Sequence, residues 1–165
     1  MDIRKSIDAL AASTLSSERI LFKKIGSESD LRSMGCLYLG EDQADMVNPL
    51  WFSLGRAYVN PCENIPLLIV KKEDNTLIGF IQLCRFLGDS EDSVSWSYFI
   101  IPEYQHMGFG TEAASLAINI LSKAFPSYKI KLSVEKENKR AQELYRRLGF
   151  SYSGEQDGDD MVFVY

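Results

Sequence analysis

The stretch Gln105-His106-Met107-Gly108-Phe109-Gly110-Thr111 joins two strongly patterned segments of the chain. The segment before it, 94–101, is an apolar run closed by Pro102, which is typical of a strand. The segment after it places apolar side chains on one face of a helix: Ala113, Leu116, Ala117, Ile120, Leu121 and Ala124. Glycines let a backbone approach a ligand closely, and free N–H groups at a helix start attract anions. The stretch therefore suits a phosphate or pyrophosphate, although glycine pairs also occur at strand-to-helix turns for steric reasons alone.

The chain ahead of this loop reads as one continuous α/β pattern without repeats or low-complexity linkers. We expect these elements there: a strand at 20–25, a helix capped by Ser27 through Tyr38, a helix opened by Asn48-Pro49, and a hairpin of antiparallel strands at 67–70 and 77–83. Ile3, Ile7 and Leu10 have helical spacing. Residues 1–19 are therefore expected to form either a short leading helix or a frayed arm.

The chain after the loop continues the alternation. We expect a strand at 128–134, parallel to 94–101 if the usual right-handed crossover applies. Ala141, Leu144, Tyr145 and Leu148 then predict an amphipathic helix, which Gly149 ends. The tail alternates in 151–154 and 161–164 around Asp157-Gly158, which indicates a tight hairpin.

Length and composition bound the kind of protein. The chain has 165 residues, 45% of them hydrophobic, which fits one domain with a real core. A formal net charge of −5 leaves no basic field for nucleic acid. Apolar runs long enough for a membrane span or a signal peptide are absent, so no membrane partner is expected. Cys36, Cys62 and Cys84 form no CxxC pair, which argues against disulfides or zinc and fits a cytoplasmic setting.

The glycine loop has two functional interpretations. Gly108, Gly110 and Ala113 fit the G-x-G-x-x-A fingerprint of dinucleotide-binding proteins, with Glu135 at the end of the next strand. That fingerprint needs its glycine turn directly at the strand end, whereas residues 102–107 intervene here. Too few residues lie beyond Glu135 to complete a doubly wound sheet, which disfavours this interpretation.

The second interpretation draws on the residues on both sides of the loop. Pro102, Gln105-x-x-Gly108-x-Gly110 and then Asn138-x-x-Ala141-x-x-Leu144-Tyr145-x-x-Leu148-Gly149-Phe150 resemble the GNAT superfamily of acyl-CoA-dependent N-acetyltransferases. The resemblance is specific over 94–150 and extends more loosely back to Ile20. It implies a single-domain α/β (α+β) fold over residues 20–165. Its central sheet would be mixed, mostly antiparallel and twisted, flanked by helices, with splayed parallel strands forming the CoA cleft.

The resemblance also implies roles for individual residues. Acetyl-CoA would be the co-substrate, and no metal would be needed. The loop would hold its pyrophosphate through the backbone of His106, Met107, Gly108, Phe109, Gly110 and Thr111. The preceding strand would pair with the pantetheine arm around Tyr98, Phe99 and Ile100, and Asn138 would contact the same arm. Tyr145 would be the general acid that protonates the departing thiolate.

Each of these residues also has a purely structural interpretation. Phe99 and Ile100 would be ordinary strand core. Asn138 would be a simple N-cap, a position that Asn favours strongly. Tyr145 lies on the apolar stripe of its helix and would be a half-buried core aromatic. His106 is the single histidine of the chain, so a phosphate or solvent contact fits it better than a catalytic triad.

The general base is not apparent in the sequence. Some family members have a glutamate five positions before the matching Asn, where this chain has Ser133, and others have an acid at the position of Ser97. Neither serine accepts a proton well. The nearby carboxylates are expected to be mostly solvated: Glu103, Glu135, Asp89, Glu91 and Asp92. A water relay through serine or backbone groups would leave no trace in the sequence.

The family implies that residues 27–61 and 89–93 recognise the acceptor. Glu41, Asp42 and Asp45 lie near Trp51 and Phe52, and acids beside aromatics suit a cationic amine. The tail from Lys131 to Glu155 resembles polyamine acetyltransferases, whereas Gly110-Thr111-Glu112-Ala113 resembles ribosomal-protein N-terminal acetyltransferases.

We therefore expect acetyl transfer to a primary amine of a small cationic acceptor, polyamine-like or amino-sugar. A protein N-terminus as acceptor, a non-catalytic acyl-CoA-binding module and a homodimer are left open.

Overall fold

The computed structural model describes residues 2–40, 48–86 and 92–165, and these build one seven-stranded sheet in the order β1-β2-β3-β4-β5-β7-β6. The strands are β1 Ile20–Lys24, β2 Asn64–Lys71, β3 Leu77–Arg85, β4 Ser93–Ile100, β5 Lys129–Val134, β6 Ser151–Asp157 and β7 Asp160–Val164. The helices are α1 Ile3–Asp8, α2 Glu28–Met34, α3 Leu50–Val59, α4 Phe109–Ala124 and α5 Lys139–Arg147, with short 3₁₀ helices at Ala12–Leu15 and Pro102–Tyr104. The expected fold class is thereby confirmed.

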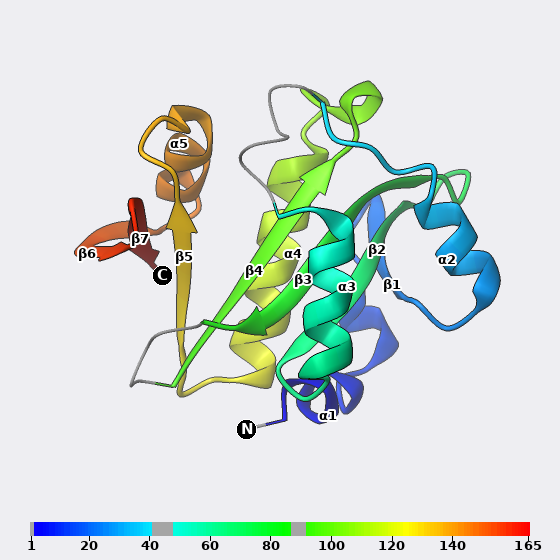
Figure 1. Ribbon diagram of the computed structural model, residues 1–165, viewed down its shortest axis with the longest axis horizontal. Helices are drawn as coiled ribbons and strands as arrows, with labels where there is room; N and C mark the ends of the chain where they lie inside the picture. Colours follow the sequence, from blue (N-terminus) through cyan, green and yellow to red (C-terminus); the bar gives the residue numbers. More distant parts are fainter. Residues whose placement is uncertain (1, 41–47, 87–91) are drawn as a thin grey trace.

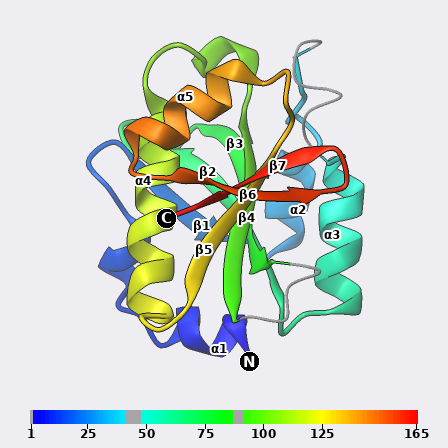
Figure 2. The same ribbon diagram turned by 90° about the vertical axis from the view of Figure 1, so that its left-hand side faces the viewer.

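Helices cover both faces of the sheet (Figures 1 and 2). Alternate residues of β2 point to opposite faces, as a strand requires. Leu67 and Ile69 join the core under α1 and α4, while Leu68 and Val70 join a second core under α2 and α3. Because both faces are covered, β2 and β3 are almost continuously apolar although they are antiparallel.

The leading segment is a helix. Asp2 caps α1 by accepting a hydrogen bond from the backbone N–H of Lys5 at 3.0 Å. Ile3 and Ile7 are fully buried in the same core as α4. The burial of these two side chains, rather than helix propensity in so short a segment, stabilises α1.

Several boundaries differ from the sequence expectation, and two of these differences have a clear physical cause. The helix capped by Ser27 ends at Met34, so Leu37 and Tyr38 lie beyond it; Gly35 is its C-cap residue. Strand β2 starts at Asn64 and so contains Pro66. Pro66 lies past the end of β1, where β2 has one neighbouring strand, so its missing N–H is tolerated there.

The only parallel pair in the described sheet is β4 with β5, and it is short. Their register joins Ser93 to Lys129 and Val94 to Ile130 and then stops. Beyond Val94 the two strands diverge, as Figure 1 shows, and β5 pairs instead with β7 on its other side. The sheet is therefore split along one edge of β4. None of the helices in the described ranges is long and apolar enough to cross a membrane.

Candidate active site

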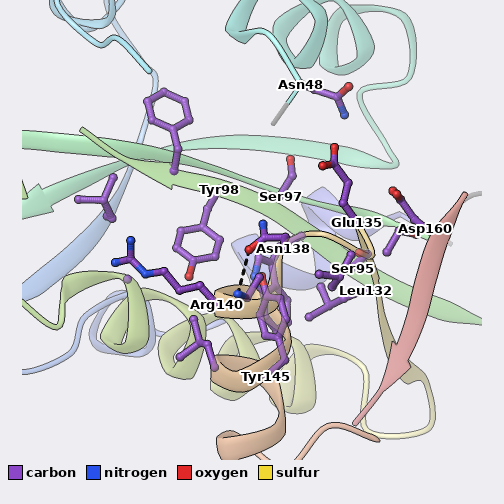
Figure 3. Close-up of a pocket in the computed structure, with 18 of the residues that line it drawn as sticks. Asn48, Ser95, Ser97, Tyr98, Leu132, Glu135, Asn138, Arg140, Tyr145 and Asp160 are labelled. Carbon is purple, nitrogen blue, oxygen red and sulfur yellow. Dashed lines mark hydrogen bonds between the residues drawn. The ribbon is translucent and has the colours of Figure 1, made fainter. Parts of the chain in front are cut away.

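The divergence of β4 and β5 opens a cleft of about 1120 Å³ in the middle of the sheet. Its walls come from β4, β5, the glycine loop, the start of α5 and the facing side of α3 (Figure 3). Beyond Val94, β4 has no hydrogen-bonding partner strand on its β5 side. An unpaired strand edge offers N–H and C=O groups to an extended amide-containing ligand.

The glycine loop closes one end of this cleft. His106 and Gly108 have positive φ angles, +59° and +83°, whereas Gly110 already lies in α4. Four of the six predicted loop residues line the cleft: His106, Gly108, Gly110 and Thr111. The other two point elsewhere, because Met107 is exposed and Phe109 packs in the core against Tyr104. Gly108 is the N-cap of α4 and has no capping side chain, so the first N–H groups of this helix have no side-chain cap.

The predicted pantetheine strand lies along the same opening. Tyr98, Phe99 and Ile100 all line the cleft, yet the side chains of Phe99 and Ile100 are buried in the two cores on opposite faces. Their contribution to a ligand would come from the backbone. Tyr98 is half-buried, and burial raises the pKa of its phenol while the positive charge of Arg140 opposes this rise. Figure 3 shows Arg140 extending from α5 toward Tyr98.

Asn138 is an N-cap and also a cleft residue. Its Oδ1 accepts a hydrogen bond from the backbone N–H of Ala141 at 3.0 Å. The structural interpretation of this residue is therefore confirmed. The cap uses only Oδ1 of this cleft-lining side chain and leaves its NH₂ group out of the cap.

Tyr145 lies on the buried face of α5 and lines the cleft. Its ring packs against Trp96 and Phe150, with centroid distances of 6.1 Å and 5.6 Å. Its hydroxyl faces the indole N–H of Trp96, which falls short of hydrogen-bond geometry. Burial raises the pKa of this phenol well above its usual value, Tyr98 adds to the rise, and the indole N–H of Trp96 opposes it. Tyr145 is therefore a neutral hydrogen-bond donor at any physiological pH.

Trp96 was not singled out by the sequence. It is 4% exposed, and its Nε1 is the one buried side-chain polar atom without a hydrogen-bond partner in the described part of the chain. Trp96 lines the cleft next to Tyr145, but its indole N–H does not form a hydrogen bond with the Tyr145 hydroxyl. In the sequence, Trp96 is one more large residue of an apolar strand, and nothing there indicates that it lines a cleft.

Carboxylates line the wall formed by β5 and the C-terminal hairpin. They are Glu135, Glu137, Asp157 and Asp160. Ser133 donates a hydrogen bond to Oδ2 of Asp157 at 2.7 Å, so a carboxylate from β6 reaches the position where some family members have a glutamate. Burial and the neighbouring acidic groups Asp157, Asp159 and Glu137 raise the pKa of Asp160. Figure 3 shows Glu135 extending into the opening toward Ser97.

The opposite wall combines polar and basic groups. Asn48, Arg56, Cys84 and Arg85 line it. Burial raises the pKa of the Cys84 thiol to about 11, although Arg56 acts against this, so the thiol is protonated and unreactive.

Several acceptor residues expected from the sequence do not reach the cleft. Trp51 is 73% exposed and does not line it, and neither does Phe52. Glu103, one of the carboxylates expected to be solvated, is exposed and accepts a hydrogen bond from the Tyr38 hydroxyl. Glu41, Asp42, Asp45, Asp89 and Glu91 lie outside the described residues. Within the described ranges, no group of three or more His, Cys, Asp or Glu residues could hold a metal ion.

The strand-edge cleft, the glycine loop and the helix start are arranged as the resemblance to acyl-CoA-dependent N-acetyltransferases implies, and the sequence comparison agrees. Residues 34–150 match the acetyltransferase (GNAT) family, so the chain belongs to this family. A solved acetyltransferase from Agrobacterium tumefaciens has a TM-score of 0.70 with 16% identity, covering 92% of each chain. At that identity the likeness shows the fold.

Two curated relatives carry polyamine names. Spermidine N(1)-acetyltransferase of Escherichia coli K12 is 48% identical over 82 residues, which are 50% of this chain and 44% of that protein. Spermine/spermidine N(1)-acetyltransferase of Bacillus subtilis 168 is 32% identical over 89 residues, 51% of this chain and 59% of that protein. The chain thus spans about half the length of the curated relatives it matches.

Proposed function

We propose that this protein transfers the acetyl group of acetyl-CoA to a primary amine of a small cationic acceptor, with a polyamine favoured over an amino-sugar. Family membership supports acyl transfer. One observation carries the proposal. A single cleft joins the glycine loop, an unpaired strand edge, a buried tyrosine and a carboxylate-lined wall.

Acetyl-CoA would lie along the cleft in a defined direction. Its pyrophosphate would accept hydrogen bonds from the backbone of residues 106–111, where the positive end of α4 favours an anion. The amides of its pantetheine arm would pair with the free edge of β4 at 98–100, beside Asn138. Its thioester would then reach the part of the cleft that Tyr145 and Trp96 line.

The reaction needs two proton transfers. The neutral amine attacks the thioester carbonyl, a C–N bond forms, and the C–S bond breaks to release a thiolate. Tyr145 would donate a hydrogen bond to the departing sulfur and then its proton. The thiol that forms has a pKa near 8.5, below that of an ordinary phenol near 10. Full transfer is therefore uphill by about 2 kcal/mol or more, and the hydrogen bond to the developing thiolate is the larger contribution.

The amine must lose a proton, because an alkylammonium with a pKa near 10 is not nucleophilic. Glu135 and Asp160 line the cleft and are the candidates to accept this proton, directly or through water. The raised pKa of Asp160 moves this carboxylate toward the pH at which a general base works best.

The wall formed by β5 and the C-terminal hairpin favours a positively charged acceptor. Four carboxylates line it, which attract a polycation and are unfavourable for an anionic acceptor. The two polyamine names among the relatives support the same class. A protein N-terminus carries one charge and a bulky chain, so it uses this wall less fully.

Measuring thiol release from acetyl-CoA tests the proposal. The panel contains spermidine, spermine, glucosamine and a peptide with a free N-terminus. We expect the highest kcat/KM with a polyamine. Preference for the peptide or the sugar would overturn the acceptor class. Acetyl-CoA binding without amine-dependent thiol release would instead identify a non-catalytic binding module.

A further inference from the structure

We infer that Arg19 and Glu112 form a latch that holds the glycine loop in its ligand-binding conformation, and that both are positioning residues for the CoA pyrophosphate. Neither residue lines the cleft. The inference rests on the proposed function, because it assigns how the loop would grip acetyl-CoA.

Glu112 is the centre of the latch. It lies in the first turn of α4, and its carboxylate accepts three hydrogen bonds from the segment ahead of β1. The donors are the Ser17 hydroxyl at 2.7 Å, the Arg19 backbone N–H at 2.8 Å and the Arg19 Nε at 2.7 Å. The carboxylate is mostly buried, 15% exposed, in this contact. Burial alone would raise the pKa of Glu112, yet these donors lower it, so the group is ionised throughout the physiological range.

Arg19 carries the contact onward to the loop. Its Nη1 donates a hydrogen bond to the backbone carbonyl of Met107 at 3.1 Å. Its guanidinium carbon lies 4.4 Å from the centre of the Phe109 ring, a cation–π contact. A Cβ on Gly108 would lie 3.2 Å from its Nη2. One side chain therefore contacts Met107 and Phe109 and lies beside Gly108 between them.

The hydrogen bond to Met107 fixes the direction of a neighbouring N–H. In a planar trans peptide the C=O and the following N–H point in opposite directions. Because Arg19 holds the Met107 carbonyl, the Gly108 N–H is turned away from Arg19, and Gly108 lines the cleft. Gly108 has a positive φ of +83°, and glycine also adopts negative φ values readily, so the residue itself does not hold this conformation. Without the latch, this peptide is free to rotate and present its carbonyl to the ligand instead.

The latch is itself anchored to the sheet. The Arg19 carbonyl accepts a hydrogen bond from the Lys72 N–H at 2.8 Å, and the Ser17 N–H donates to the Ile20 carbonyl at 2.9 Å. Ile20 starts β1 and is fully buried. The loop conformation is thus tied to β1 at the edge of the sheet, and a site held in this way does not have to order its backbone when ligand arrives.

Two variants distinguish an effect of the latch geometry on acetyl-CoA binding from an effect of charge alone. Glu112→Gln removes a negative charge near an anion site, so electrostatics alone predicts tighter acetyl-CoA binding, whereas the latch predicts weaker binding. Arg19→Lys keeps the charge, but an ammonium cannot span Glu112 and Met107 as the guanidinium fork does. We expect each variant to raise the KM for acetyl-CoA about tenfold, the weight of one charge-assisted hydrogen bond, with kcat nearly unchanged.

The pyrophosphate-free analogue S-acetylpantetheine provides the internal comparison. It cannot use the loop, so its kcat/KM should be the same in wild type and both variants. The matched control is Asp30→Asn. Asp30 accepts from Lys23 at 2.6 Å, also from Gly26 and Ser27, and lies away from the cleft. It should lower thermal stability and leave the KM for acetyl-CoA unchanged.

The outcomes are separable. Wild type that binds no acetyl-CoA by calorimetry overturns the proposed function. Wild type that binds, with Glu112→Gln binding equally or more tightly, overturns the latch. A defect in Arg19→Lys without one in Glu112→Gln means that Arg19 contacts phosphate directly and also overturns it. If both variants fail to fold, Ser17→Ala removes a single donor to Glu112 and should raise the KM for acetyl-CoA about threefold; an unchanged KM there contradicts the latch.

Discussion

Replacing Tyr145 with phenylalanine removes one oxygen from the cleft and keeps the ring that packs against Trp96 and Phe150. Because the indole N–H of Trp96 falls short of hydrogen-bond geometry to this hydroxyl, its loss breaks no well-formed hydrogen bond. We expect the free energy of unfolding to change by less than about 1 kcal/mol, which is a shift in Tm of about 2–4 °C at most for a chain of this size. A role in the core alone would predict no further effect.

The effect on the reaction should be much larger. A hydrogen bond to a charged group contributes about 1.5–3 kcal/mol. Placed on the developing thiolate, that free energy corresponds to a rate lower by about 10- to 150-fold. Acetyl-CoA affinity should stay near wild type, because the ground-state thioester carries no charge on sulfur.

Single-turnover thiol release at saturating acetyl-CoA and amine measures the chemical step directly. Tyr128→Phe is the matched control, since Tyr128 packs on the same core but does not line the cleft. A Tyr145→Phe rate equal to wild type would refute the assignment. Tyr145→Ala is not informative here, because it also leaves a cavity.

Charges and backbone angles support three further predictions. Asp160→Asn should raise Tm at pH 8, because ionised Asp160, with its raised pKa, costs stability above that pKa and the cost vanishes by about pH 3, below the unfolded carboxyl pKa; it should also raise the KM for a polyamine. Asp30→Asn should lower Tm at pH 7, because Lys23, Gly26 and Ser27 lower the pKa of Asp30, and this loss should shrink in thermal scans as pH falls below about 4. Gly108→Val and Gly110→Val should each weaken acetyl-CoA binding at least about tenfold by calorimetry, since the first position has a positive φ and the second would place a branched side chain on the cleft wall.

Local signals predicted most of the fold. Ser27 caps α2 by accepting from the Asp30 N–H, Asn138 caps α5, and Gly149 ends it with a φ of +99°. Each feature depends on a few neighbouring residues, so the sequence displays it. The strand predicted at 67–70 in fact starts at Asn64 and contains Pro66, because a proline is tolerated where no strand pairs on its N–H side. Where β1 ends cannot be read from the residues of β2.

The parts of the candidate site that belong to contiguous motifs were predictable from the sequence, and the contacts between distant segments were not. The loop and Tyr145 belong to motifs of contiguous sequence. Asp157 was interpreted as a hairpin-turn residue and Asp160 was not singled out. Only the pairing of β7 with β5 brings both to the cleft beside Ser133. The Arg19 to Glu112 contact joins residues 93 apart, and no pattern in either segment indicates the other.

The position of CoA in a crystal structure of this protein tests the central claim most directly. We predict that its pyrophosphate oxygens lie within about 3.2 Å of backbone nitrogens in residues 106–111, with the thiol in hydrogen-bond reach of the Tyr145 hydroxyl. We also predict that the pantetheine arm fills the gap between β4 and β5. A CoA molecule bound with its pyrophosphate away from this loop, or with its thiol outside the cleft, would contradict the account.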